Sequence, residues 1–192
     1  MRFRRDKKEI TKPSFSKISK VMNIRENLKQ EYSKALTLRI LAYIGNDANR
    51  MAELMACFFD AEGRICQRAA WTVGFITEKQ PQLIEPYLEQ MLLNLRTPRH
   101  DAILRNTMRV LRDVPNIPDN VLGLAADAAF RFLENPSVAI AVRSFSIRVL
   151  AKICKKEPEL KDELRALIED ILEQDKAPAI VSAGRDVLKQ LK

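Results

Sequence analysis

The amino-acid sequence predicts an all-α protein, a right-handed α-solenoid of about five stacked antiparallel helix pairs. Three observations predict this fold class. Apolar residues recur at the spacing of amphipathic helices, no segment alternates with the period of a β-strand over a useful length, and prolines recur at a nearly constant interval. Such a repeat is typical of proteins in which each helical hairpin buries its apolar side against its neighbours.

The prolines mark a repeating unit. Six of the nine prolines form two interleaved series with a period near 39 residues. The first series, at spacings of 37 and 40, is Pro81, Pro118 and Pro158, and the second, at spacings of 38 and 42, is Pro98, Pro136 and Pro178. Because proline lacks the N–H that a helix interior needs, the first series predicts the starts of one helix class, called A. The second series predicts the turns from each A helix to a following B helix.

The predicted elements follow one another along the chain in pairs. A basic N-terminal tail is expected over residues 1–15, and a single solenoid domain over 16–192. The first two helices are expected near 16–31 and 32–44. Four A/B pairs follow, at 47–59 with 64–78, 82–95 with 101–113, 118–133 with 138–155, and 158–173 with 177–191. The last A helix shows the expected apolar stripe, formed by Leu160, Leu164, Leu167, Ile168, Ile171 and Leu172.

Several segments resemble HEAT repeats over roughly residues 33–192. The stretch "LIEPYLEQML" looks like the first HEAT helix with Pro86 as its internal kink, and "RAAWTVGFI" looks like a small-residue second helix. In "LENPSVAIAVRSFSIRVL", Asn135-Pro136 is similar to the family's Asp-Pro turn, and Val142-Arg143 is similar to the Val-Arg pair that opens the second helix. The resemblance implies a scaffold or binding protein whose B helices line a concave surface. A few enzymes, such as the AlkD-like DNA glycosylases, are built on similar repeats.

The composition argues against several other classes of protein. The five glycines are too scattered for a Rossmann or P-loop phosphate site. Cys57, Cys66 and Cys154 form no CxxC pair, which indicates buried thiols in a reducing compartment and argues against a disulfide framework or a zinc site. No window approaches 18 consecutive apolar residues, and the N-terminus has no apolar signal core. We therefore expect a cytoplasmic protein without a membrane segment.

Catalytic groups are not evident in the sequence. His100 is the only histidine, and it lies in a turn without a GxSxG nucleophile motif elsewhere in the chain. One histidine supplies only one metal ligand. Trp71, the only tryptophan, is interpreted as core packing, the alternative being a stacking residue of an AlkD-like cleft. The sequence thus predicts a protein that is not an enzyme and has no cofactor, metal or catalytic residue.

Charge divides between the two helix classes. Residues 1–20 carry a net charge of +6 and the other 172 residues only +2. Within the body, however, the predicted B segments sum to +13 and the A segments to −11. Part of the basic charge is interpreted as structural, since basic residues favour helix C-termini and pair within stacks, as expected for Arg143, Lys155, Lys156 and Lys189. The remaining candidates for a ligand-binding groove are Arg68, Arg105, Arg109, Arg112, Arg148 and Lys152.

Two functional hypotheses follow from this charge pattern. The first is a non-enzymatic interaction or scaffold module that binds an acidic protein partner on a basic concave face, where charge of one sign focuses the field. The second is binding of the phosphate backbone of duplex nucleic acid by the same arginines, with "MRFRRDKK" as a basic arm. An AlkD-like DNA glycosylase is a distant third, because aromatic residues make up only 6% of the chain.

Overall fold

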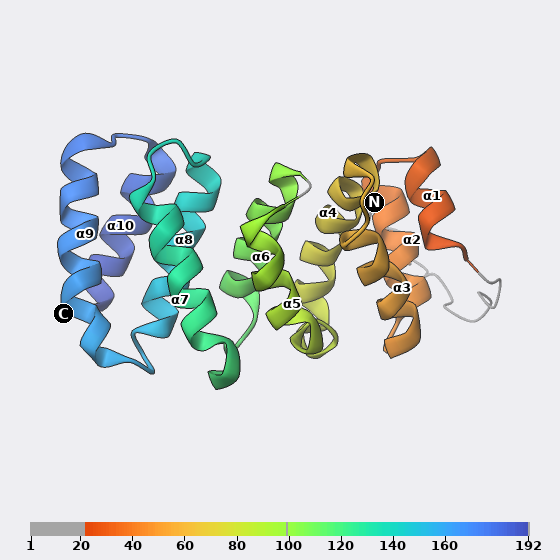
Figure 1. Cartoon of the computed structure of the whole chain (residues 1–192), viewed down its shortest axis with the longest axis horizontal. Helices are drawn as coiled ribbons and strands as arrows, with labels where there is room; N and C mark the ends of the chain where they lie inside the picture. The colour runs from red at the N-terminus through yellow and green to blue at the C-terminus, as the bar shows by residue number, and fades with distance from the viewer. Residues whose placement is uncertain (1–21, 99, 192) are drawn as a thin grey trace, which may run out of the picture.

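The fold is a row of stacked helix pairs. The computed structural model describes residues 22–98 and 100–191. Over these residues it holds ten α-helices and four short 3-10 helices, and no β-strand. The predicted all-α class is therefore confirmed, whereas the predicted basic tail at 1–15 lies outside the described residues. Figure 1 shows the pairs following one another along the long axis, from α1 and α2 at one end to α9 and α10 at the other.

Odd-numbered helices are the A members of the pairs, and even-numbered helices are the B members. The pairs are α1 (Ile24–Gln30) with α2 (Lys34–Ile44), α3 (Ala48–Phe58) with α4 (Gly63–Lys79), α5 (Leu88–Leu93) with α6 (Asp101–Asp113), α7 (Asp119–Glu134) with α8 (Ile140–Ile153), and α9 (Lys161–Gln174) with α10 (Pro178–Gln190). The four 3-10 helices are η1 (Pro81–Leu83), η2 (Glu85–Tyr87), η3 (Asn94–Arg96) and η4 (Pro158–Leu160).

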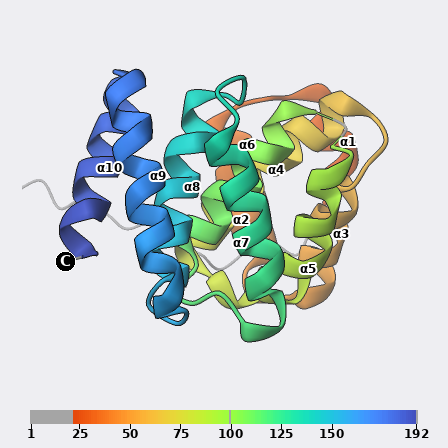
Figure 2. The ribbon, with the colours of Figure 1, turned by 60° about the vertical axis from the view of Figure 1, so that its left-hand side comes forward.

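The B helices form a continuous layer. Helix α4 packs against α6, α6 against α8, and α8 against α10. The A helices pack beside them, α3 on α4, α7 on α8 and α9 on α10. The turned view of Figure 2 shows the last two pairs side by side. This arrangement confirms the predicted solenoid-like stacking, in which a pair buries its apolar stripe only against its neighbours.

One apolar core runs through the stack from Ile24 to Leu191. Small side chains allow the B helices to approach closely, and in α4 the residues Ala69, Ala70 and Gly74 are all buried. Phe58 of α3 is the largest of the fully buried side chains. The predicted small-residue character of α4 thus has a direct packing consequence.

The two helices of the first pair, which the proline series does not reach, begin at polar caps. The Asn23 side chain accepts a hydrogen bond from the Glu26 N–H at 3.0 Å, and Ser33 accepts one from the Leu36 N–H at 3.0 Å. Such capping satisfies amide groups that have no partner within the helix. Within the described residues, the helix predicted near 16–31 is present as α1, which begins at Ile24 after the Asn23 cap and ends at Gln30. Residues 16–21 lie outside the described residues.

The prediction of one kinked helix over residues 82–95 is wrong. Pro86 opens the 3-10 turn η2 instead of bending a continuous helix, and the α-helix begins only at Leu88. Two prolines five residues apart, Pro81 and Pro86, remove two amide donors from this segment, so short 3-10 turns replace the first α-helical turns. The fourth B helix is predicted to start at residue 138. In the structure this helix, α8, starts at Ile140 and Ala139 is its N-cap residue.

Candidate functional site

All six predicted site residues lie in the B layer. Helix α4 carries Arg68, α6 carries three of the arginines, and α8 carries Arg148 and Lys152. These three helices are consecutive neighbours in the stack, so the structure brings the six residues into adjoining repeats. Their individual contacts nevertheless differ sharply.

Arg68 and Lys152 are bound to the ends of other helices. Nη1 of Arg68 donates hydrogen bonds to the carbonyl oxygens of Leu28, at 2.5 Å, and Lys29, at 2.9 Å, in the last turn of α1. Nζ of Lys152 donates to the carbonyls of Leu111, at 3.0 Å, of Arg112, at 2.7 Å, and of Val114. The last carbonyls of a helix lack partners within it, so each cation stabilises the end of a helix in another pair.

Arg109 ties α6 to α4. Its guanidinium forms an ion pair with Glu78 of α4 and a longer one, at 3.5 Å, with Asp113 of α6. It also lies 5.2 Å from the centre of the Phe75 ring. Gly74 makes room for this side chain, because a Cβ at that position would come within 3.1 Å of Nη1 of Arg109.

Arg112 and Arg148 make further contacts within the B layer. The Arg112 guanidinium donates to both carboxylate oxygens of Asp113, at 2.6 and 2.9 Å, and lies 4.4 Å from the centre of the Phe145 ring in α8. Arg148 pairs with Asp186 of α10 at 3.2 Å, and both side chains remain well exposed. The α6–α8 and α8–α10 contacts thus each include an arginine.

Arg105 differs from the other five. Its side chain is exposed, and among the described residues it takes part in no hydrogen bond or ion pair. It lies on the rim of a groove between the N-terminal ends of α6 and α8. Of the six predicted residues, only Arg105 has no hydrogen-bond or ion-pair partner within the described part of the chain.

Sequence reasoning missed an aromatic component of the same layer. Tyr32 is 51% exposed, and its ring lies 5.1 Å from that of Trp71 in an edge-to-face arrangement. Trp71 in turn lies 5.3 Å from Phe75. The prediction that Trp71 belongs to the core is wrong, because its ring is only half-buried and faces away from the buried side of α4. The signal was available in the spacing of Arg68, Trp71 and Phe75, which share one helix face opposite the buried alanines.

These residues form a connected surface that we call the aromatic–arginine strip. Its members are Tyr32, Trp71, Phe75, Phe145, Arg68, Arg109 and Arg112. At one end of the strip, the Arg68 guanidinium lies 5.7 Å from the centre of the Tyr32 ring. At the other end, the Arg112 guanidinium lies over the Phe145 ring. Aromatic rings under guanidinium groups give a rigid surface that is both apolar and cationic.

The repeats have a recognisable family. A family model described as a HEAT repeat domain matches residues 24–191, nearly the whole described part of the chain. The chain belongs to the HEAT repeat family. HEAT repeats generally mediate protein–protein interactions as scaffolds and are typically non-enzymatic. The prediction of an interaction or scaffold protein is therefore confirmed at the level of the family. The search of curated proteins found no match. The search of solved structures found none either.

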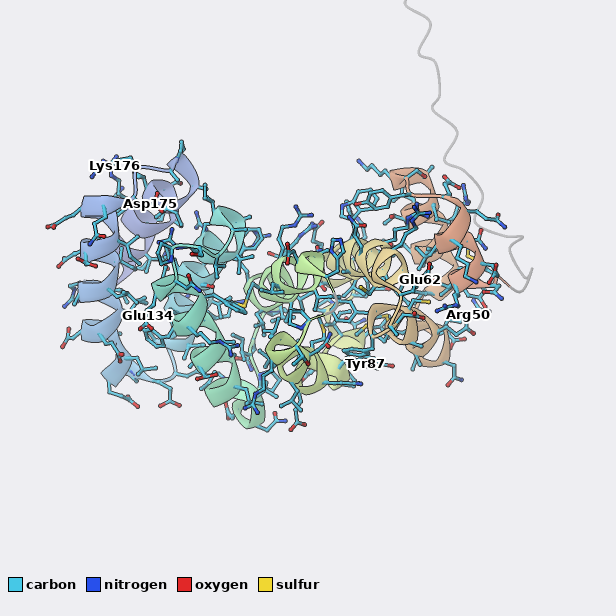
Figure 3. All side chains as sticks on the ribbon, turned by 45° about the horizontal axis from the view of Figure 1, so that its top comes forward. Arg50, Glu62, Tyr87, Glu134, Asp175 and Lys176 are labelled. Atoms are coloured by element: carbon cyan, nitrogen blue, oxygen red, sulfur yellow. The ribbon has the colours of Figure 1, made fainter. Side chains whose placement is uncertain are left out.

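Two of the four basic residues predicted to be structural, Arg143 and Lys156, bond to neighbouring segments of this HEAT repeat protein. Arg143 of α8 is 5% exposed, donates to the Leu133 carbonyl at 3.3 Å and pairs with Asp175 at 2.5 Å. Asp175 lies in the connection between α9 and α10 (Figure 3). The Ala177 N–H and the Arg143 guanidinium hold the pKa of this carboxyl below its ordinary value. Nζ of Lys156 likewise donates to the Ile117 carbonyl at 2.7 Å and pairs with Asp119.

The three cysteines of this HEAT repeat protein are buried and free. Burial raises the pKa of the Cys57, Cys66 and Cys154 thiols, which keeps them protonated and unreactive at neutral pH. Within residues 22–98 and 100–191, no three His, Cys, Asp or Glu side chains gather in a way that could hold a metal ion. None of the described helices is long and apolar enough to cross a membrane.

Lys152 gives this HEAT repeat protein a pH-dependent contribution to stability. Burial lowers the pKa of its ammonium group from 10.5 to about 8, while the nearby carboxylate of Asp113 acts in the opposite direction. Between pH 8 and pH 10.5 the unfolded chain therefore binds more protons at this group than the folded chain, so its contribution to stability rises with pH.

We expect the unfolding free energy of the wild type, relative to that of Lys152→Met, to increase over this pH interval. The increase should stay below about 1.4 kcal/mol per pH unit, because a single group binds at most one proton more in the unfolded chain than in the folded chain. Urea unfolding of both proteins at a series of pH values measures the difference. A difference that is constant or falls with pH would show that the three carbonyl acceptors keep the ammonium group charged.

Proposed function

We propose that the aromatic–arginine strip and the B-helix surface around it bind an acidic segment of a partner protein. The observation that carries this proposal is the chain of contacts Arg68–Tyr32–Trp71–Phe75–Arg109 along neighbouring helices. Tyrosine, tryptophan and arginine are the side chains most enriched among the dominant contributors to protein–protein binding. Family membership supports a protein partner, and the strip supports a particular surface for it.

The charge of this surface favours an acidic partner. The six predicted cations outnumber the three carboxylates that pair with them, Glu78, Asp113 and Asp186. The predicted A segments carry a net negative charge and the B segments a net positive one, which supports attraction of an acidic partner to the B surface. An arginine that already pairs with one carboxylate can donate hydrogen bonds to a second one from the free edge of its guanidinium, since it has five N–H donors.

The internal contacts also make the surface rigid before a partner arrives. Arg109 and Arg112 are held by carboxylates and aromatic rings, so binding need not immobilise free side chains. Ordering a long side chain at an interface costs about 0.5–1.5 kcal/mol, which preorganisation avoids. The contacts that hold the repeats together therefore also favour binding. A protein partner is better supported than duplex nucleic acid, because HEAT repeats generally mediate protein–protein interactions.

Charge reversal at two B-layer arginines should weaken binding of acidic peptides. Arg105→Glu combined with Arg148→Glu is expected to lower affinity by about tenfold or more, since both residues change from attracting to repelling carboxylates. Neither arginine is buried, and the Arg148–Asp186 pair is exposed, so stability should change by less than about 1 kcal/mol. The ligands come from selection of a displayed library of random short peptides on the wild-type protein, followed by anisotropy titrations.

The matched control is Arg96→Glu with Arg131→Glu, which changes net charge equally on exposed residues of the A-helix side. This control should bind as the wild type does. Selection of peptides without net negative charge, or equal binding to the two double variants, would contradict the proposal. Retardation of mixed-sequence duplex DNA at low salt, with a steep salt dependence, would instead favour the nucleic-acid hypothesis.

A further inference from the structure

A groove adjoins the aromatic–arginine strip at the N-terminal ends of the B helices. It lies between α6 and α8 and has a volume of about 560 Å³. Its apolar lining includes Leu104, Val138 and Val142, and Gln67 of α4 and Arg105 lie among its polar residues. A volume in this range is typical of sites that enclose part of a ligand.

The groove extends the strip along the same helix faces. Arg105 precedes Arg109 by four residues in α6, and Gln67 precedes Trp71 by four residues in α4. Residues four apart on a helix lie one above the other on the same face. A single extended segment lying on the strip could therefore reach the groove without leaving the B layer.

We propose that this groove is the anchor site of the partner-binding surface, taking an aliphatic side chain of the acidic segment while Arg105 pairs with a neighbouring carboxylate. The inference rests on the proposed function and adds the chemistry of the partner, an acidic sequence interrupted by an aliphatic residue. Leu104 and Val138 are only half-buried, so an aliphatic guest would cover apolar surface of these two side chains that now meets solvent.

The polar groups around the groove fix where the carboxylate lies. Arg105 is exposed and takes part in no ion pair within the described residues, so its guanidinium is available. Asp101 also lines the groove and repels a carboxylate on its own side. Nδ1 of His100 already accepts the Ala102 N–H at 3.0 Å, which caps α6. The carboxylate therefore belongs on the Arg105 side of the groove.

Two labelled synthetic peptides test the anchor site. One repeats Glu-Glu-Leu and the other repeats Glu-Glu-Ser, so they have the same charge and differ only in the aliphatic residue. The leucine peptide should bind the wild-type protein about tenfold more tightly, as expected for burial of one aliphatic side chain. Ala139→Trp places an indole in the groove from an exposed, extended position, and it should abolish the preference for leucine.

The matched control is Ala166→Trp, an exposed position on α9 away from the groove, which should keep the preference. Equal binding of the two peptides to the wild type, with both weakened by Arg105→Glu and Arg148→Glu, would overturn the anchor site and leave the acidic-segment proposal standing. Failure of both peptides to bind at low salt would overturn both proposals. Loss of the leucine preference in Ala166→Trp as well would also contradict the anchor site.

Discussion

Replacing Arg143 with methionine is expected to lower the free energy of unfolding by about 2–4 kcal/mol. The guanidinium is almost completely buried and joins two neighbouring pairs, through the Leu133 carbonyl at the end of α7 and the carboxylate of Asp175. Methionine fills similar space but leaves both acceptors without their donor. The expected loss is below that of a fully buried pair because Asp175 retains 24% side-chain exposure.

Urea unfolding followed by circular dichroism measures this change. Arg131→Met is the matched control, since Arg131 is an exposed arginine of α7, and its effect should stay within about 0.5 kcal/mol. Adding Asp175→Asn to Arg143→Met should cost little more, because the two residues act as a pair. A loss of less than about 1 kcal/mol for Arg143→Met would show that the contact does not hold these pairs together.

Replacing Trp71 with alanine is expected to weaken binding of the Glu-Glu-Leu peptide by about 30-fold or more. Trp71 stands at the middle of the strip, in contact with both Tyr32 and Phe75, and its ring offers the largest apolar surface there. Truncation would remove the surface on which the partner lies and also free the two neighbouring rings. Trp71→Phe should retain most of the affinity, because it preserves an aromatic face.

Leu93→Ala is the control for loss of an exposed apolar side chain, since Leu93 of α5 is 46% exposed and lies on an A helix. It should leave peptide affinity unchanged. Because Trp71 is only half-buried, circular dichroism should show that Trp71→Ala remains folded. A folded Trp71→Ala variant that binds the peptide as tightly as the wild type would exclude the strip as the binding surface.

Much of the fold could be predicted because local chemistry repeats along the chain. Pro118 and Pro178 lie next to or at the first residues of α7 and α10, where a missing N–H costs little. The start of the first helix was harder to predict, because no proline of the two series lies near it and the Asn23 side chain caps α1. The prediction that Pro86 kinks a continuous helix is wrong. The family resemblance suggested a kink, whereas the nearby Pro81 leaves too few donors for an α-helical turn.

The site was only partly predictable, since the hydrogen-bond partners of several of these cations are remote in sequence. Arg68 reaches Leu28 across 40 residues, Lys152 reaches Leu111 across 41, and Arg148 reaches Asp186 across 38. These separations are close to the repeat period near 39 residues, because each contact joins one repeat to a neighbouring repeat. Charge counting cannot separate such contacts from free cations. A search for partners one period away would have distinguished them.

The fluorescence of Trp71 tests the central claim most directly, because Trp71 is the only tryptophan of the chain and lies within the strip. Titration of the wild-type protein with Glu-Glu-Leu peptide should change its emission saturably, with the same midpoint as the anisotropy of the labelled peptide. The Arg105→Glu and Arg148→Glu variant should shift both midpoints together. Peptide binding by anisotropy with no change in Trp71 emission would place the partner elsewhere and contradict the account.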